Sequence, residues 1–171
     1  MEKTFEKDAQ YISIVKDILD TKAFDDMKHI RHHDNNRLDH CIKVSYYSYK
    51  IAKALHVDYI DVARAGLLHD FFSERTVDYN KMKDKVLLFT TKHPLDAVEN
   101  AKKYFTLNAK QEDIIKCHMF PMDYRIPKYV ESWIVNLVDT GLSVNEFSKK
   151  FSYKLSYITN LLLIVLLNTI K

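Results

Sequence analysis

The chain has 171 residues, of which 47% are hydrophobic and 29% are charged. This balance is typical of a globular protein, and the length suits one domain with a sizeable core. Two glycines and three prolines are too few for the many tight turns of a sheet-rich fold. The net charge of +3 is spread along the chain, so no basic stripe indicates specific nucleic-acid binding. We therefore expect an all-α fold and one domain over residues 1–171.

We expect a cytoplasmic protein without a membrane span. The first ten residues lack the apolar stretch of a signal peptide. The apolar run LLLIVLL, even when extended to residues 157–170, is shorter than the span of about 20 residues that crosses a bilayer. We expect it to belong to packing helices at 143–170, although it could also provide the face of a homodimer. Cys41 and Cys117 form no Cys-x-x-Cys pair, and buried free thiols suit a reducing cytoplasm.

The first part of the chain predicts two helices with a break between them. Hydrophobic spacing favours a helix over residues 5–24, with an apolar face made of Phe5, Ile12, Val15 and Leu19. The segment HIRHHDNN interrupts this pattern, and its Asp or Asn residues can cap a second helix over residues 37–55. The shared face expected for that helix carries His40, Val44, Tyr47, Ile51 and Leu55.

The rest of the chain predicts further helices with recognisable caps and breakers. Asp58 can cap a third helix that ends at His69–Asp70. Residues 78–92 fit a short helix and a loop, after which Pro94 suits the first turn of a helix that reaches Phe105. Later signals are the cap Asn108, the turn between Pro121 and Pro127, the stop Gly141 and the capping box of Ser143 and Glu146. They predict a helix that carries His118, a helix from Pro127 to Gly141 and a further short helix.

Histidines and aspartates recur along these helices in the order His…His-Asp…His…His…Asp. They are His40, His69, Asp70, His93, His118 and Asp139. Imidazole nitrogens and carboxylate oxygens together suit Mn, Fe, Co, Ni or Zn better than Ca. A helical bundle builds such a centre from inward side chains on facing helices. Asp139 fits this picture, because it follows the apolar run WIVNLV, where a carboxylate needs a cation, a donor or an exit to solvent.

Gly66 precedes the His-Asp pair by one helical turn. A glycine inside a helix lowers its stability by roughly 1 kcal/mol, so some other requirement must offset the loss. Two explanations are open: space for a metal or a substrate, or close packing against another helix.

The motifs that carry these residues resemble, in order, those of the HD-domain family of metal-dependent phosphohydrolases. They are RLDHCIKVSYYSYKIAKAL, ARAGLLHD, KHPLDAVENA, IIKCHMFP and VNLVD, which form a motif core at 37–139. The resemblance implies an all-α, HD-type helical bundle, similar to the small stand-alone bacterial HD proteins. It implies one metal bound by His40, His69, Asp70 and Asp139, and a second metal bound by His93 and His118 and bridged by Asp70.

Two lysines that many members of the family carry are missing here. They would follow the His-Asp pair and the last aspartate, where this chain has Phe71-Phe72 and Thr140. A phosphate would need other cations, and we expect Arg37 and His33 to bind the substrate. Arg37 shares a helical face with His40, although a surface ion pair with a nearby acid is equally open. Further helper candidates, for which a surface role is the alternative, are Arg75, Lys92 and Arg125.

The resemblance predicts a metal-dependent phosphohydrolase that acts on a nucleotide-like phosphomonoester or phosphodiester. A metal-activated water would attack the phosphorus, Asp70 would orient this water, and Glu74 would protonate the leaving group. The cofactors would be two divalent transition metals, and the partner would be a small-molecule phosphoester. Two alternatives use the same ligands: a di-iron oxygenase with the HD fold, and a non-catalytic module that binds a nucleotide.

Overall fold

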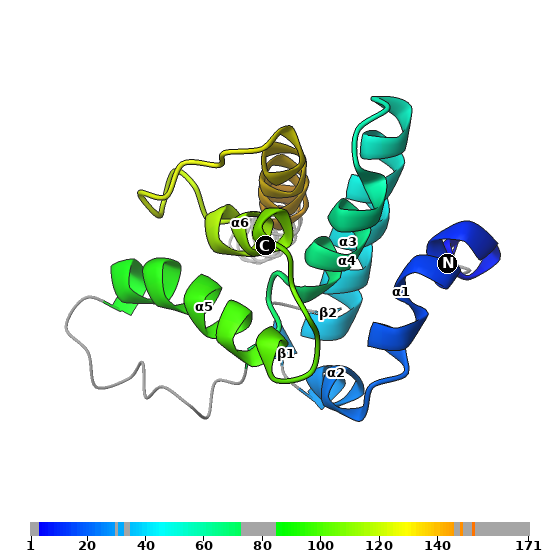
Figure 1. Ribbon diagram of the computed structural model, residues 1–171. Helices are drawn as coiled ribbons and strands as arrows, with labels where there is room; N and C mark the ends of the chain where they lie inside the picture. Colours follow the sequence, from blue (N-terminus) through cyan, green and yellow to red (C-terminus); the bar gives the residue numbers. More distant parts are fainter. Residues whose placement is uncertain are drawn as a thin grey trace, which may run out of the picture. The chain divides into compact units, whose positions relative to one another are not determined.

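Helices form nearly all of the regular structure described by the computed structural model (Figure 1). The structure describes residues 4–29, 31–32, 35–72, 85–145, 148 and 152. The strands within this part of the chain are β1 (Arg31–His32) and β2 (Asn35–Asn36), which pair antiparallel. Because these strands have only two residues each and the other described elements are helices, the prediction of an all-α fold is confirmed. None of the described helices is long and apolar enough to cross a membrane.

The chain divides into two units, Met1–Thr140 and Gly141–Lys171, and the first contains the whole His/Asp series. Within this unit α4 contacts α1, α3, α5 and α6, so it forms the centre of the bundle. The ranges of these helices are α1 (Ala9–Leu19), α3 (Arg37–Ala54), α4 (Tyr59–Leu68), α5 (Lys85–Lys102) and α6 (Ala109–Cys117). Figure 1 shows α3 and α4 side by side, with α1 next to them. Both cysteines are buried free thiols, as expected.

Several short helices replace the single helix predicted over residues 5–24. Besides α1 they are η1 (Thr4–Lys7), α2 (Lys22–Asp25) and η2 (Asp26–His29). The prediction is wrong because α1 ends at Leu19 and the extended backbone of Thr21 separates it from α2, which begins at Lys22. The residues fully buried on α1 are Tyr11, Val15 and Ile18, whereas Phe5, Ile12 and Leu19 are only half-buried. Hydrophobic spacing alone overlooks Tyr11, whose hydroxyl donates to the buried hydroxyl of Ser45.

Close contact between α3 and α4 explains Gly66. A Cβ atom added to Gly66 would lie 3.1 Å from the Cα of Ser45 on α3. Gly66 therefore serves helix packing, which was one of the two explanations left open by the sequence. Next to this contact, the Ser45 hydroxyl donates to the Ala63 carbonyl (2.6 Å) and accepts from the Tyr11 hydroxyl (2.8 Å). These two hydrogen bonds join α1, α3 and α4.

The buried face of α3 differs from the predicted one, although its ends match the prediction within one residue. His40 and Val44 are buried as expected, but Tyr47, Ile51 and Leu55 are 47%, 42% and 58% exposed. The buried side is completed by Arg37, Cys41, Ile42, Ser45, Ser48, Tyr49 and Ala52. Ser45 on this side allows α4 to approach closely at Gly66, and this packing outweighs the polarity of the serine.

Pro94 does not mark the start of a helix, as the sequence suggested. α5 starts at Lys85 and runs through Pro94, so the prediction that Pro94 opens a helix is wrong. The proline removes one backbone hydrogen bond, while buried Thr90, His93 and Ala97 on both sides of it hold α5 in the bundle. Of the short helix and loop predicted at 78–92, residues 78–84 lie outside the described part of the chain.

Asn108 begins α6 as predicted, through a capping box with Gln111. The last described helix covers residues 130–145 and passes through Gly141, so Gly141 is not its stop. A helical glycine costs only about 1 kcal/mol relative to alanine, which the rest of the helix can offset. Ser143 lies within this helix and does not begin another. Glu146 and most of the packing helices predicted at 143–170 lie outside the described residues.

Candidate metal centre

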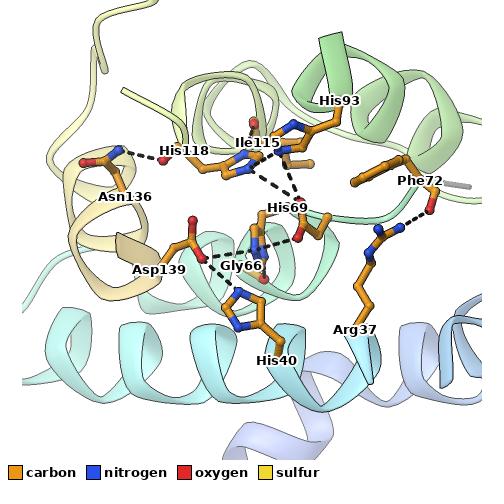
Figure 2. A network of polar contacts seen from close by, with 11 residues as sticks. Arg37, His40, Gly66, His69, Phe72, His93, Ile115, His118, Asn136 and Asp139 are labelled. Atoms are coloured by element: carbon orange, nitrogen blue, oxygen red, sulfur yellow. Dashed lines mark hydrogen bonds and ion pairs between the residues drawn. The ribbon is translucent and has the colours of Figure 1, made fainter. Parts of the chain in front are cut away.

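The His/Asp series comes together from five elements of the fold. Its members are His40 on α3, His69 and Asp70 at the C-terminal end of α4, His93 on α5, His118 at the C-terminal end of α6, and Asp139 on the helix over residues 130–145. All six side chains are buried. Figure 2 shows the four imidazoles and Asp139 directed toward one another between the helices.

The first group of donors consists of His40, His69 and Asp139. Each offers one ligand atom, and these atoms lie within 4.8 Å of one another. Nε2 of His40 is 2.9 Å from Oδ1 of Asp139, and Nε2 of His69 is 3.7 Å from the same oxygen. This is a compact set of two nitrogens and one oxygen that can surround a single cation.

The second group consists of Asp70, His93 and His118. Oδ1 of Asp70 is 3.4 Å from Nε2 of His93 and 3.6 Å from Nε2 of His118, and these two nitrogens are 2.9 Å apart. The other oxygen of Asp70, Oδ2, is 3.8 Å from Nε2 of His69. The carboxylate of Asp70 therefore faces the second group with one oxygen and the first group with the other.

Backbone carbonyls fix the tautomers of two imidazoles. Nδ1 of His69 donates to the Gly66 carbonyl, and Nδ1 of His118 donates to the Ile115 carbonyl, both at 2.8 Å. Because a carbonyl only accepts, Nδ1 carries the proton, and Nε2 of the neutral ring keeps its lone pair. Hydrogen bonds of this kind orient the histidines that bind metals. Nε2 of both rings is thus available as a ligand.

A divalent cation fits the polar atoms of this centre. Nε2 of His69 and Oδ1 of Asp70 are buried and lack a hydrogen-bond partner among the described residues. The lone pair of His69 Nε2 faces oxygens of Asp70 and Asp139, and this contact is repulsive unless a cation lies between the atoms. The mixture of imidazole and carboxylate donors matches the preferences of Mn, Fe, Co, Ni or Zn.

The charge state of the centre also suits a cation. Burial lowers the pKa of His69 to about 4, so this imidazole is neutral near pH 7. Burial would raise the pKa of Asp70, but the neighbouring imidazoles and the Arg37 guanidinium hold it well below its usual range. Burial likewise opposes the ionised form of Asp139, yet its hydrogen bond with His40 and the nearby imidazoles keep the pKa low. Neutral imidazoles and ionised carboxylates are the forms that bind metals.

The comparison with protein families agrees with this geometry. The sequence model of the HD domain matches residues 37–140, which include all six members of the series. The chain belongs to the HD-domain family. HD domains bind divalent metals, and the family implies a metal-dependent hydrolase superfamily. A search among curated proteins and a search among solved structures each return no match.

In this HD domain Arg37 is a buried residue, so the surface position that was one of its two alternatives is wrong. Its side chain is 1% exposed, and its Nη1 donates to the Phe72 carbonyl at 2.9 Å. Its guanidinium carbon lies 4.0 Å from the centroid of the Phe72 ring, a cation–π geometry. The charge of Arg37 is near enough to Asp70 to lower the pKa of that carboxyl.

The other predicted helpers of the HD domain are placed less favourably. Lys92 pairs with Asp96 at 2.6 Å, and Arg125 bonds to the Thr91 carbonyl and to Asp123. The remaining candidates, His33, Glu74 and Arg75, lie outside the described residues.

The sequence analysis overlooked two asparagines that lie near the candidate metal centre. Asn136 donates to the carbonyls of His118 and Phe120, and Asn100 on α5 donates to the Phe71 carbonyl next to Asp70. For Asn136 the sequence offered one signal, which is an amide within the apolar run WIVNLV, one helical turn before Asp139. This signal was weak, because the partners of both asparagines are backbone groups of other elements.

Proposed function

We propose that the protein is a phosphohydrolase with two divalent metals bound on either side of Asp70. The observation that carries this proposal is the position of the Asp70 carboxylate, whose Oδ2 faces the imidazole of His69 and whose Oδ1 faces those of His93 and His118. His40, His69 and Asp139 would hold one metal, and His93 and His118 would hold the other. Iron, manganese, cobalt, nickel and zinc all suit these ligands.

The residues of the centre have separate roles in this proposal. When bound, divalent metals lower the pKa of water toward neutrality and offset the charge of a phosphoryl group. Asp70 accepts a hydrogen bond from the attacking water and orients it toward the phosphorus. The carbonyls of Gly66 and Ile115 keep the rings of His69 and His118 in the required orientation. The leaving oxygen needs a proton, for which Glu74 remains the predicted donor.

The proposed substrate is a small nucleotide-like phosphoester. The buried cation of Arg37 beside the His-Asp turn and the net charge of +3 favour an anionic ligand. Arg37 and His33 remain predicted binding residues for its phosphate.

The test combines metal content with hydrolysis. Protein purified anaerobically without an affinity metal should contain two metals per chain by mass spectrometry, and should hydrolyse a phosphomonoester or phosphodiester reporter. Asp70→Asn should lower hydrolysis by more than about 100-fold, because even the outer partners of metal ligands contribute about 10–100-fold. Asp61→Asn is the control, since Asp61 is also buried but bonds to Asn108 and Gln111.

Three results would contradict the proposal. A protein that stays metal-free after addition of manganese or iron is not a metal-dependent hydrolase. One metal per chain would argue against the shared role of Asp70. Two irons with oxygen uptake and no hydrolysis would instead identify an oxygenase.

A further inference from the structure

Asn136 connects the two groups of donors. It lies one helical turn before Asp139 of the first group, and its side chain is 3% exposed. Its Nδ2 donates to the carbonyl of His118, a member of the second group, at 2.7 Å, and to the carbonyl of Phe120 at 2.6 Å. Figure 2 shows Asn136 and Asp139 on one helix, with Asn136 directed toward the backbone of His118.

These hydrogen bonds occur where a helix leaves its carbonyls without partners. His118 is the C-terminal cap of α6, and the last carbonyls of a helix have no amide of the same helix to bind. Both protons of the Asn136 amide are used, so the buried donor group is satisfied on both sides. Asn136 therefore fixes the backbone of His118, while the Ile115 carbonyl fixes its ring.

We propose that Asn136 is a positioning residue of the metal centre. By holding the main chain of His118 against the helix of Asp139, it sets the distance between the two groups and thus favours the simultaneous binding of two metals. This inference rests on the proposed two-metal function. It assigns to Asn136 no contact with metal or substrate.

Ser132 provides a matched control on the same helix. It is completely buried, and its hydroxyl donates to Oδ2 of Asp113 on α6 at 2.7 Å. This bond joins the helix over residues 130–145 to α6 at Asp113, outside both groups of donors, whereas the Asn136 bonds reach the C-terminal cap of α6 and the turn after it. Loss of either side chain removes a buried hydrogen bond from the helix over residues 130–145 to α6 or to its C-terminal end. A purely structural role of Asn136 would therefore give the two variants the same properties.

The experiment compares Asn136→Ala with Ser132→Ala in the full chain. Metal-free protein is titrated with Co²⁺, which is followed by visible absorption and by metal content, and thermal melting is recorded without metal. In Asn136→Ala the affinity for one of the two Co²⁺ ions should fall by about 10–100-fold, the range found for outer partners of metal ligands, and the absorption spectrum should change. Ser132→Ala should lose thermal stability but keep both Co²⁺ affinities and the wild-type spectrum.

Wild-type Co²⁺ affinities and spectrum in Asn136→Ala would overturn the inference and leave the proposed function intact. Binding of fewer than two Co²⁺ ions by the wild-type protein would contradict the two-metal function and this inference with it. If Asn136→Ala does not fold, Asn136→Ser decides the question, because serine keeps one donor and should show a smaller change in the same affinity and spectrum.

Discussion

His69 links the two groups of donors through one atom. Its Nε2 lies within 3.8 Å of an oxygen from Asp70 and of an oxygen from Asp139, while Nδ1 is held by the Gly66 carbonyl. The ring is completely buried, and its neutral form is the one that the surroundings favour. The protonation of this single residue should therefore affect the stability of the metal-free fold.

The stability of the metal-free protein should fall as the pH is lowered from about 6.5 toward 4. The pKa of His69 is about 4 in the folded chain and about 6.5 in an unfolded chain. The unfolded state binds more protons in this window, so folding is favoured above it and loses up to about 3 kcal/mol through it. Asp70 and Asp139, whose pKa values are lowered, contribute stability that is lost only at still lower pH.

Urea unfolding at pH 7, 6 and 5 checks this expectation. His69→Gln should flatten the dependence on pH, whereas replacement of the exposed His56 by glutamine should keep it. The same dependence in His69→Gln and in the wild-type protein would show that other groups cause it.

At the scale of elements, the parts of the fold that could be predicted are those with local signals. Asp58 and Asn108 accept hydrogen bonds from amides three residues ahead, so each cap can be read from a few adjacent letters. The buried face of α3 could not be predicted, because Ser45 is buried where Gly66 of α4 approaches its backbone. This burial depends on a helix that the sequence of α3 does not contain.

The candidate centre shows the same contrast. Its six donors have a characteristic order along the chain, and they could be identified before their positions were known. Asn136 has no such pattern, since its partners are carbonyls beyond the end of α6. Arg37 was predicted to share a helical face with His40 and to bind the substrate, and the second part stays a prediction. Its burial against Phe72 could be seen only in the fold.

Gly66→Ala should destabilise the protein by up to about 2 kcal/mol. The new methyl group would lie 3.1 Å from the Cα of Ser45, and overpacking against backbone costs about 1–3 kcal/mol. The gain in helix propensity offsets only about 1 kcal/mol of this cost. Gly141→Ala is the control: among the described residues, no atom outside its own helix lies within 4 Å of the added Cβ, so this change should stabilise the helix. Chemical denaturation measures both, and a Gly66→Ala protein as stable as the wild type would refute the packing argument.

At the scale of the whole molecule, the centre depends on elements that are distant in sequence. The first group joins α3, the end of α4 and the helix over residues 130–145, and the second joins the end of α4 with α5 and α6. A bound metal should therefore stabilise the fold and not only one helix.

Removal of metal should lower the unfolding temperature, and addition of metal should restore it. At a free metal concentration of 100 times the Kd, one site adds about 2.7 kcal/mol to the free energy of unfolding. Differential scanning fluorimetry with Mn²⁺ after chelation checks this, and Ca²⁺ should give a smaller shift, since it prefers sites made only of oxygens. Equal unfolding temperatures with and without Mn²⁺ would show that the donors do not bind it.

The origin of the donors from five elements has a kinetic consequence. Partial opening of any one ligand-bearing helix separates at least one donor from its group, so a metal can leave through sub-global openings as well as through complete unfolding. The dissociation rate of the metal is then set by the ligand-bearing helix that opens most often. The amide hydrogens of that helix should exchange with solvent at a matching rate.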